Sequence, residues 1–293
     1  MLLWQEVNFF FLQTREITMK IAYFGGDLHL GCIEVFKLSG HEVGHIFVNH
    51  EMPYNKNIRD YALSNDISVT TVKPEKQLLE KLVNYGFNCF FSAEYPWLIP
   101  VPDISVKTIN VHPTLLPEGK GPTPVIWLIK KYQEFAGITF HKLSSEFDSG
   151  DIILQQPMQI TENDSYETWM AKLNIEIPIQ LSRLLEDFDN LYKSARPQSG
   201  GSYWPKIELS HRTINWYAGV HEIEKLVRAC GRFGAMTTIS GDIMLINHVH
   251  ASQFHHQWAA GTLLRKDEES YVMAASDGIV VLMKRDIVEK LKP

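Results

Sequence analysis

The feature that most constrains the fold is an alternation of short apolar runs with helical segments, which begins at Met19. Each run has five or six residues and is followed by a stretch with the apolar spacing of a helix. Such alternation indicates βαβ units with right-handed crossovers, and therefore a Rossmann-like, mostly parallel sheet in an α/β domain. The expected strands are Lys20–Phe24, Val43–Val48, Ile67–Val72 and Asn88–Ser92, and the expected helices are Leu30–Leu38, Asn57–Ser64 and Glu75–Tyr85.

The second part of this domain is less regular. A strand at Val106–Val111 runs into a loop dense in proline and glycine. A long helix is expected at Ser165–Phe188, with Asp164 or Ser165 as its N-cap, and Pro178 should break or kink it. The other expected elements are the helix Val125–Tyr132 and the strands Gly137–Leu143 and Asp151–Met158.

A second domain follows a stretch with the composition of a linker. One helix, His221–Cys230, and about five short strands predict a small β-barrel-like domain of the OB type. Those strands are Ala235–Ile239, Ile243–Ile246, Thr262–Leu264, Tyr271–Ala274 and Ile279–Met283. The expected organisation is an extension at 1–18, a catalytic domain at 19–192, a linker at 193–206 and a β-rich domain at 207–293.

Composition excludes several classes of protein. The formal net charge of −6 gives the chain no general attraction for nucleic acid. Within the extension, the apolar run Val7–Leu12 is far shorter than the roughly 20 residues that span a membrane, and no basic residue precedes it. Three scattered cysteines predict neither disulfides nor a zinc site, and His248, His250, His255 and His256 are expected in a surface loop. We therefore expect a cytoplasmic protein with no metal and no membrane association.

The residues that predict chemistry lie around the fifth expected strand. Asn110 and His112 are two residues apart, so both side chains point to the same side of the strand. They lie near its carboxyl end, where parallel sheets place their active sites, and Asp148 and Asp151 mark a later turn. An amide, an imidazole and a carboxylate suit acyl transfer to an amine. Each residue alone also fits a structural role, in a turn or as a satisfied histidine.

Two motifs add a family resemblance. The segment INVHPTLLPEGKGPTP (109–124) and the downstream FDSGDIILQ (147–155) resemble the paired signatures of the folate-dependent formyltransferases. AEYPWLIP (93–100) resembles that family's folate-pocket segment. SYWPK (202–206), TINW (213–216) and GRFGAMTTISGDIMLI (231–246) resemble the C-terminal domain of its sugar-formylating and methionyl-tRNA branches. The resemblance covers about residues 19–285.

The resemblance implies a role for individual residues. Asn110 would donate to the formyl oxyanion, His112 would transfer protons and Asp148 would be its carboxylate partner. The co-substrate would be N10-formyltetrahydrofolate, bound by Tyr95, Trp97, Leu98, Ile99, Leu115, Leu116 and Asp151. The sequence departs from the family at Thr114, where serine is commoner, and in a less basic loop at 118–120.

The acceptor is less constrained than the formyl donor. A tRNA substrate needs cationic contacts to phosphates, and neither residues 48–66 nor 200–293 carry a basic run. A nucleotide-linked amino sugar is therefore expected, with Lys120, Gly121 and Lys206, and also Arg212, as candidate contacts. The alternatives are a methionyl-tRNA formyltransferase and a formyltetrahydrofolate hydrolase. A homodimer is compatible with the sequence.

Overall fold

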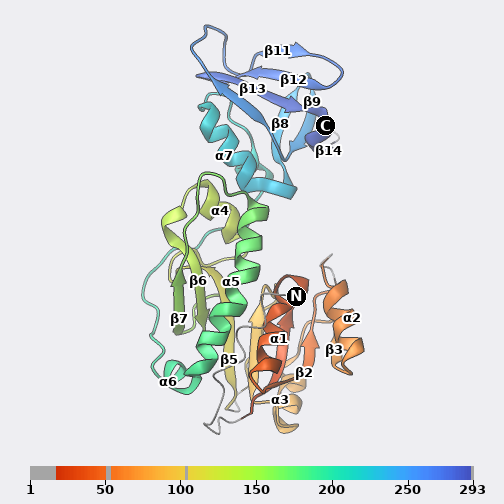
Figure 1. Ribbon diagram of the computed structural model, residues 1–293, viewed down its shortest axis with the longest axis vertical. Helices are drawn as coiled ribbons and strands as arrows, with labels where there is room; N and C mark the ends of the chain where they lie inside the picture. The colour runs from red at the N-terminus through yellow and green to blue at the C-terminus, as the bar shows by residue number, and fades with distance from the viewer. Residues whose placement is uncertain (1–17, 51–53, 103–104, 292–293) are drawn as a thin grey trace.

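A sheet of seven strands forms the centre of the N-terminal domain, and a smaller β-rich domain lies beyond the ends of α4 (Pro124–Lys130) and α5 (Tyr166–Glu186) (Figure 1). The computed structural model describes residues 18–50, 54–102 and 105–291. The expected extension at 1–18 therefore lies almost entirely outside the described residues. None of the helices in the described ranges is long and apolar enough to cross a membrane.

The seven strands run in the order β3-β2-β1-β4-β5-β6-β7. The first five are parallel to one another, and β6 and β7 add antiparallel pairs at one edge. The prediction of an α/β domain with a mostly parallel sheet is confirmed. The strands are β1 (Lys20–Gly25), β2 (Glu42–Phe47), β3 (Ser68–Thr70), β4 (Cys89–Ala93), β5 (Lys107–Thr114), β6 (Ala136–His141) and β7 (Ile152–Pro157).

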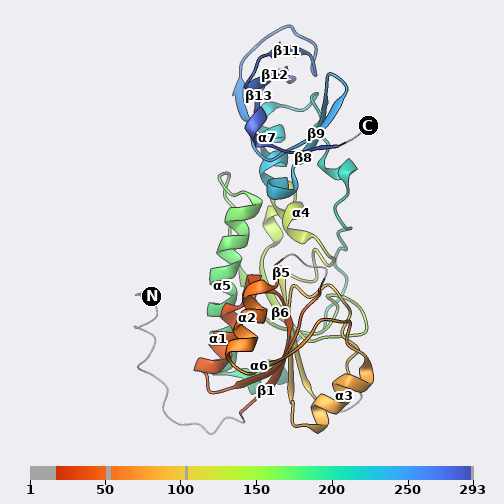
Figure 2. The same cartoon turned by 90° about the vertical axis from the view of Figure 1, so that its right-hand side faces the viewer.

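Helices cover both faces of this sheet, which explains why its central strands are continuously apolar. In β1, Ile21 and Tyr23 belong to one core cluster, whereas Ala22 and Phe24 belong to another. The first cluster lies under α1, α2 and α5, and the second under α3, on the opposite face (Figure 2). The helices are α1 (Gly31–Leu38), α2 (Lys56–Ser64), α3 (Lys76–Asn84), α4 (Pro124–Lys130), α5 (Tyr166–Glu186) and α6 (Phe188–Lys193), with 3-10 turns η1 (Asp27–His29) and η2 (Gln133–Phe135).

Strand β5 is longer than the sequence pattern predicts, because its two neighbours end at different points. Its parallel pairing with β4 stops at the pair Ala93–Val111, but its antiparallel pairing with β6 continues to Thr114. Pro113 lies where the register with β6 shifts, a position that tolerates a missing N–H. The last residues of β5 therefore extend beyond the parallel part of the sheet.

Pro178 was expected to break or kink the long helix. It does not break it, because α5 is one helix from Tyr166 to Glu186. Pro178 is buried, and its ring lies against Gly31 at the start of α1. Packing at this contact between α1 and α5 offsets the lost backbone hydrogen bond. Ser165 is the N-cap, as predicted, in a capping box with Thr168.

The C-terminal domain packs α7 (Val220–Cys230) against two antiparallel sheets. Seven strands are present where about five were predicted, in the orders β10-β13-β12-β11 and β14-β9-β8. The two unpredicted strands, β10 and β14, are edge strands with largely exposed residues, so they lack a clear apolar alternation. His250, expected in a loop, begins β10. The elements are η3 (Leu209–Arg212), η4 (Gly231–Phe233), β8 (Ala235–Ile239), β9 (Asp242–Ile246), β10 (His250–Gln253), β11 (Leu263–Lys266), β12 (Ser270–Ala274), β13 (Gly278–Met283), η5 (Lys284–Asp286) and β14 (Ile287–Leu291).

The segment with linker composition lies along the N-terminal domain, and we call residues 196–205 the strap. At its start, the backbone of Arg196 pairs with Ile152 through two hydrogen bonds of 2.8 Å. Near its end, Trp204 is buried and stacks on Tyr132 with the ring centroids 4.6 Å apart. The strap is therefore a bound part of the fold.

We expect Phe91→Ala to lower the free energy of unfolding by about 3–5 kcal/mol, the usual cost of truncating a buried phenylalanine. Phe91 is 0% exposed, and its ring contacts Tyr23 and Phe36 at centroid distances of 5.6 and 5.1 Å. Urea denaturation measures the change. The control Leu63→Ala, at a position 81% exposed, should stay within about 0.5 kcal/mol of the wild type.

Candidate active site

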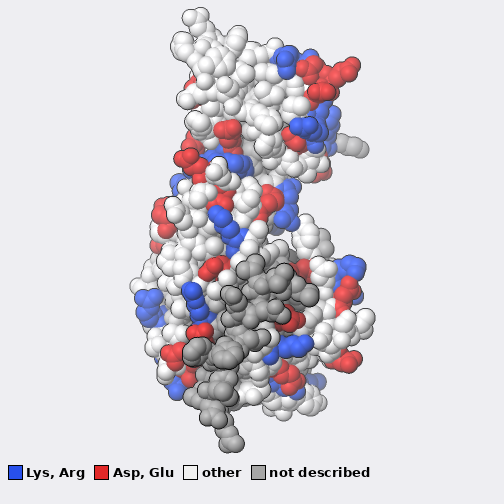
Figure 3. Space-filling model, viewed as in Figure 1, with Lys and Arg blue, Asp and Glu red and all other residues white. Residues whose placement is uncertain are grey.

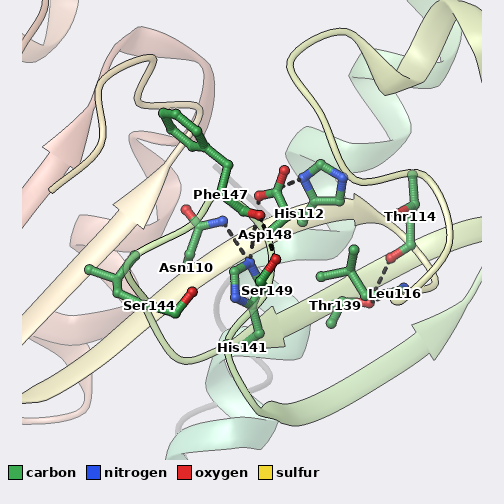
Figure 4. Close-up of polar contacts among 12 residues, drawn as sticks. Asn110, His112, Thr114, Leu116, Thr139, His141, Ser144, Phe147, Asp148 and Ser149 are labelled. Atoms are coloured by element: carbon green, nitrogen blue, oxygen red, sulfur yellow. Dashed lines mark hydrogen bonds and ion pairs between the residues drawn. The ribbon is translucent and has the colours of Figure 1, made fainter. Parts of the chain in front are cut away.

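Three polar side chains meet where β5 extends beyond β4 (Figure 4). Asn110 and His112 come from β5, and Asp148 comes from the loop between β6 and β7. The Nδ1 atom of His112 lies 3.4 Å from Oδ1 of Asp148, and both side chains are buried. The structure thus brings together the three residues predicted to carry the chemistry.

The loop that carries Asp148 is held by backbone and side-chain contacts. Asp148 has a positive φ of 54°, and its Oδ2 accepts a hydrogen bond of 2.9 Å from the backbone N–H of Gly121. Gln198 of the strap donates to the carbonyl oxygens of Asp148 and Gly150, at 2.9 and 2.7 Å. A side chain at Gly150 would collide with the backbone of Lys142. These contacts fix the carboxylate toward His112.

The orientation of His112 follows from its second ring nitrogen. Nε2 lies 2.8 Å from the carbonyl oxygen of Gly119, which can only accept, so Nε2 carries a hydrogen. Nδ1 is then the nitrogen that can exchange a proton, and it faces Asp148. The strap supports this arrangement, because the N–H of Gly119 donates to Oγ of Ser202 at 3.1 Å. The hydroxyl of Ser202 in turn contacts the carboxylate of Glu118.

His141 is a site residue that the sequence analysis missed. Its Nδ1 lies 2.8 Å from the carbonyl oxygen of Lys142, so Nδ1 carries the hydrogen. Its Nε2 therefore accepts from the Nδ2 amide of Asn110, 2.9 Å away. This bond fixes the amide and leaves its other N–H free to donate into the site. The available signal was a histidine within a predicted strand, which pairs with Asn110 in the register of β5 and β6.

The imidazole of His141 stays neutral in this environment. Burial lowers the pKa of His141 to about 4, although the nearby carboxylate of Asp148 acts in the opposite direction. The Nε2 atom of His141 lies 3.8 Å from Oδ1 of Asp148. A neutral His141 remains an acceptor for Asn110 throughout the physiological pH range.

Two cavities meet at this constellation. The smaller, about 50 Å³, and the larger, about 530 Å³, share four lining residues. The shared residues are Tyr95, Asn110, Phe147 and Asp148. His112 lines the larger cavity but not the smaller one. A group held at the junction would be reachable from both sides, which is the arrangement that a transfer between two substrates requires.

The residues predicted to bind folate divide into two groups. Tyr95, Trp97, Leu98 and Ile99 follow β4 and line the smaller cavity. The other three line neither cavity: Leu115 lies against Gly137, Leu116 is bonded through its backbone to Thr139 and Gln155, and Asp151 pairs with Lys142.

The residues predicted to contact the acceptor are also separated. Gly121 lines the larger cavity, whereas Lys120 and Lys206 line neither, and Lys206 is exposed. The guanidinium of Arg212 is bound by the carbonyl oxygens of Phe233 and Gly234. The basic residue that does line the larger cavity is Arg232. It comes from the C-terminal domain, and no sequence pattern marked it. Among the described residues, no three His, Cys, Asp or Glu side chains are grouped to hold a metal ion.

The fold and the site together define a two-domain α/β protein with an amide, an imidazole and a carboxylate at the edge of a parallel sheet. Family comparison agrees with this class. Residues 46–184 match the family described as formyl transferase, and residues 206–290 match the formyl transferase C-terminal domain. The chain belongs to the formyl transferase family, and so to the transferases.

Two relatives by sequence are methionyl-tRNA formyltransferases. The chain is 26% identical to a methionyl-tRNA formyltransferase of Coprothermobacter proteolyticus over 277 residues, which is 90% of this chain and 91% of the relative. It is 30% identical to that of Ehrlichia ruminantium over 184 residues, 61% of this chain and 58% of the relative.

Solved structures with the same fold carry other names. The sugar 3N-formyl transferase WlaRD matches with a TM-score of 0.65 at 18% identity, covering 94% of this chain and 100% of that one. An N-formyltransferase of Helicobacter canadensis, solved with folinic acid and dTDP-3-aminofucose, matches with a TM-score of 0.65 at 19% identity, covering 91% and 99%. HypX of Aquifex aeolicus matches with a TM-score of 0.65 at 18% identity, covering 90% of this chain and 45% of HypX.

We expect the neutral His141 to make the protein less stable as the pH falls. An unfolded histidine has a pKa of about 6.5, whereas folded His141 has a pKa of about 4. Between these values the unfolded chain binds the extra proton, so the free energy of unfolding decreases with decreasing pH. His141→Gln should reduce this slope, measured by urea denaturation between pH 7.5 and 4.5.

The exposed histidine His248, changed to Gln, is the matched control for that slope. Buried His29, whose pKa is also lowered to about 4 by desolvation, remains in both variants, so the slope should shrink without vanishing. Equal slopes in His141→Gln and the wild type would contradict a neutral, buried His141.

Proposed function

We propose that the protein transfers a formyl group from N10-formyltetrahydrofolate to the primary amine of a nucleotide-linked amino sugar. The observation that carries this proposal is the meeting of a small and a large cavity at Asn110 and Asp148. Two cavities that share the reacting groups suit a formyl donor on one side and an acceptor on the other. Relatives in structure are described with tetrahydrofolate, with folinic acid and with dTDP-3-aminofucose.

The smaller cavity suits the formyl-bearing part of the folate. It is lined by aromatic and aliphatic side chains with a few polar groups, the usual composition of a site for a flat organic ring. Tyr95, Trp97, Leu98 and Ile99 supply the apolar wall, and Ser92 and Ser144 supply hydroxyl groups. Because this cavity is only about 50 Å³, we assign to it the edge of the folate that carries the formyl group, directed toward Asn110.

The proposed reaction is a direct attack of the acceptor's neutral amine on the formyl carbon. The free N–H of Asn110 donates to the oxyanion of the tetrahedral intermediate. The pair of His112 and Asp148 takes the proton that the amine loses and returns one to the folate nitrogen as the C–N bond breaks. Contacts from Gly119, Gly121 and Gln198 hold that pair in place, so its geometry is set before the substrates bind.

The larger cavity suits a nucleotide-linked sugar in size and chemistry. Its volume of about 530 Å³ is that of a small-molecule site. Four exposed aromatic side chains line it, namely Tyr54, Phe147, Tyr203 and Phe233, and aromatic faces bind nucleotide bases by stacking. Arg232 is the candidate contact for a phosphate.

A methionyl-tRNA acceptor is the alternative, favoured by the names of the sequence relatives. Binding tRNA requires basic side chains along the path of the phosphates. On the face shown in Figure 3, lysine and arginine are interspersed with aspartate and glutamate over both domains. The net charge of −6 gives no compensating long-range attraction, so we favour the sugar. We also propose a cytoplasmic location, where three buried free cysteines stay reduced.

We expect Asn110→Ala and His112→Ala each to lower kcat by about 100–1000-fold, the usual loss for one oxyanion or proton-transfer group. The release of tetrahydrofolate in the presence of the acceptor measures the rate. Asn65→Ala and His248→Ala, at exposed positions, are the matched controls and should retain full activity. Near-normal turnover in either site variant, with the fold intact, would remove that residue from the mechanism.

The acceptor is tested by offering the wild-type enzyme three mixtures, each with N10-formyltetrahydrofolate. They contain dTDP- or UDP-linked 3-amino and 4-amino sugars, methionyl initiator tRNA, or no acceptor. We expect formylated sugar by mass spectrometry and no turnover in the other two. Formylation of the tRNA alone would replace the sugar with the alternative, and release of tetrahydrofolate without any acceptor would indicate a hydrolase.

A further inference from the structure

Glu94 directly follows the last residue of β4, near the point where β5 continues with His112. Strands β4 and β5 pair in parallel up to Ala93 and Val111, after which β4 ends and β5 continues with His112. Glu94 lines the larger cavity together with His112 and does not line the smaller one. It therefore lies on the acceptor side of the proposed site, at the carboxyl end of a parallel strand, where ligands of such sheets bind.

The backbone of Glu94 is in a costly conformation. Its φ of +56° is in the left-handed region, which is unfavourable for a residue with a side chain. Glycine or asparagine would adopt this conformation more readily. A strained residue that carries a charge at a cavity wall is a candidate for a functional constraint.

Among the described residues, the Glu94 carboxylate has no close partner. Within residues 18–50, 54–102 and 105–291, no side chain forms a hydrogen bond or ion pair with it. The guanidinium of Arg232 acts on it at longer range. That guanidinium already pairs with Glu167, at 3.7 Å from Nε to Oε1, and lies over the rings of Tyr54 and Tyr166 at 5.4 and 5.5 Å. The charge of Arg232 is thus shared between Glu167 and Glu94, and Arg232 neutralises Glu94 only in part.

We propose that Glu94 binds the ammonium group of the acceptor and takes one of its protons, so that the N–H bond breaks, an O–H bond forms on the carboxylate, and the neutral amine faces the formyl carbon. This inference rests on the proposed function only in requiring that an amine acceptor enters the larger cavity. An amino sugar and an aminoacyl ester both present a primary amine that can carry a proton. A carboxylate on the wall of the same cavity as His112 recognises the protonated group and favours it over a hydroxyl at the same position.

The electrostatics of the cavity support a cation at this position. Desolvation raises the pKa of Glu94 to about 7, with Arg232 acting in the opposite direction. The other titratable groups that interact with it are the phenols of Tyr23 on β1 and Tyr166 on α5, both neutral at this pH because burial raises their pKa values. A bound ammonium would stabilise the ionised carboxylate and offset its desolvation.

The test compares an amine with its hydroxyl counterpart. Binding of dTDP-3-aminofucose and dTDP-fucose is measured by calorimetry at pH 7.5 for the wild type, Glu94→Gln, Glu94→Asp and Glu94→Asn. The wild type should prefer the amine at least about tenfold, and the Gln and Asn variants should prefer neither. Glu94→Asp keeps the charge and should recover part of the preference. Asparagine tolerates a positive φ, so Glu94→Asn guards against a folding defect in Glu94→Gln.

Two controls isolate the carboxylate. Asp66 also has a positive φ, 55°, but is exposed on the surface, so Asp66→Asn makes the same chemical change outside the cavity and should leave the preference intact. The dissociation constant for folinic acid should stay within twofold in every Glu94 variant, because Glu94 does not line the smaller cavity.

The outcomes separate this inference from the proposed function. If Glu94→Gln formylates the amino sugar with unchanged kcat/KM and keeps the amine preference, the role of Glu94 is overturned and the sugar acceptor stands. If the wild type formylates only methionyl-tRNA, the sugar acceptor fails. The same variants are then assayed on that tRNA, where a drop in kcat/KM of at least tenfold supports Glu94 and no change overturns it.

Discussion

The site depends on one mismatch in length between neighbouring strands. β5 pairs with β4 only as far as Val111, but its antiparallel partner β6 satisfies its backbone for three residues more. His112 is therefore held by a hydrogen-bonded strand while lying beyond the parallel neighbour. Asn110 precedes it on the same side and still faces a partner on each flank. The backbone of His112 is therefore held rigidly by β6, while its side chain remains accessible from the larger cavity.

Around this strand the groups are oriented mainly by backbone carbonyls. Gly119 fixes one ring nitrogen of His112, and Lys142 fixes one of His141. A carbonyl oxygen cannot donate, so each contact determines which nitrogen carries the hydrogen. The tautomers, and through them the amide orientation of Asn110, follow from the main chain. Substitutions that preserve these loops should preserve the tautomers, whatever the identity of the exposed side chains nearby.

Sequence patterns predicted the elements that bury apolar surface and the residues that stand in motifs. The parallel strands, a cap at Asp164 or Ser165, and the two motifs that hold Asn110 with His112 and Asp148 were all visible in this way. Residues that act through tertiary contacts were not. His141 has the pattern of any strand residue, Arg232 comes from the other domain, and Pro178 is accommodated by Gly31 on a distant helix. The polar edge strands β10 and β14 carry too little periodicity to be recognised.

The strap connects the two domains and also holds loops of the active site. Its residues Gln198 and Ser202 hold the loops of Asp148 and Gly119, and the same stretch of chain leads directly into the C-terminal domain. Arg232 then returns from that domain to the cavity. A chain cut before residue 196 would keep the proposed catalytic side chains but lose the strap's hydrogen bonds to their loops. The boundary between structural domains is therefore not a boundary between functional ones.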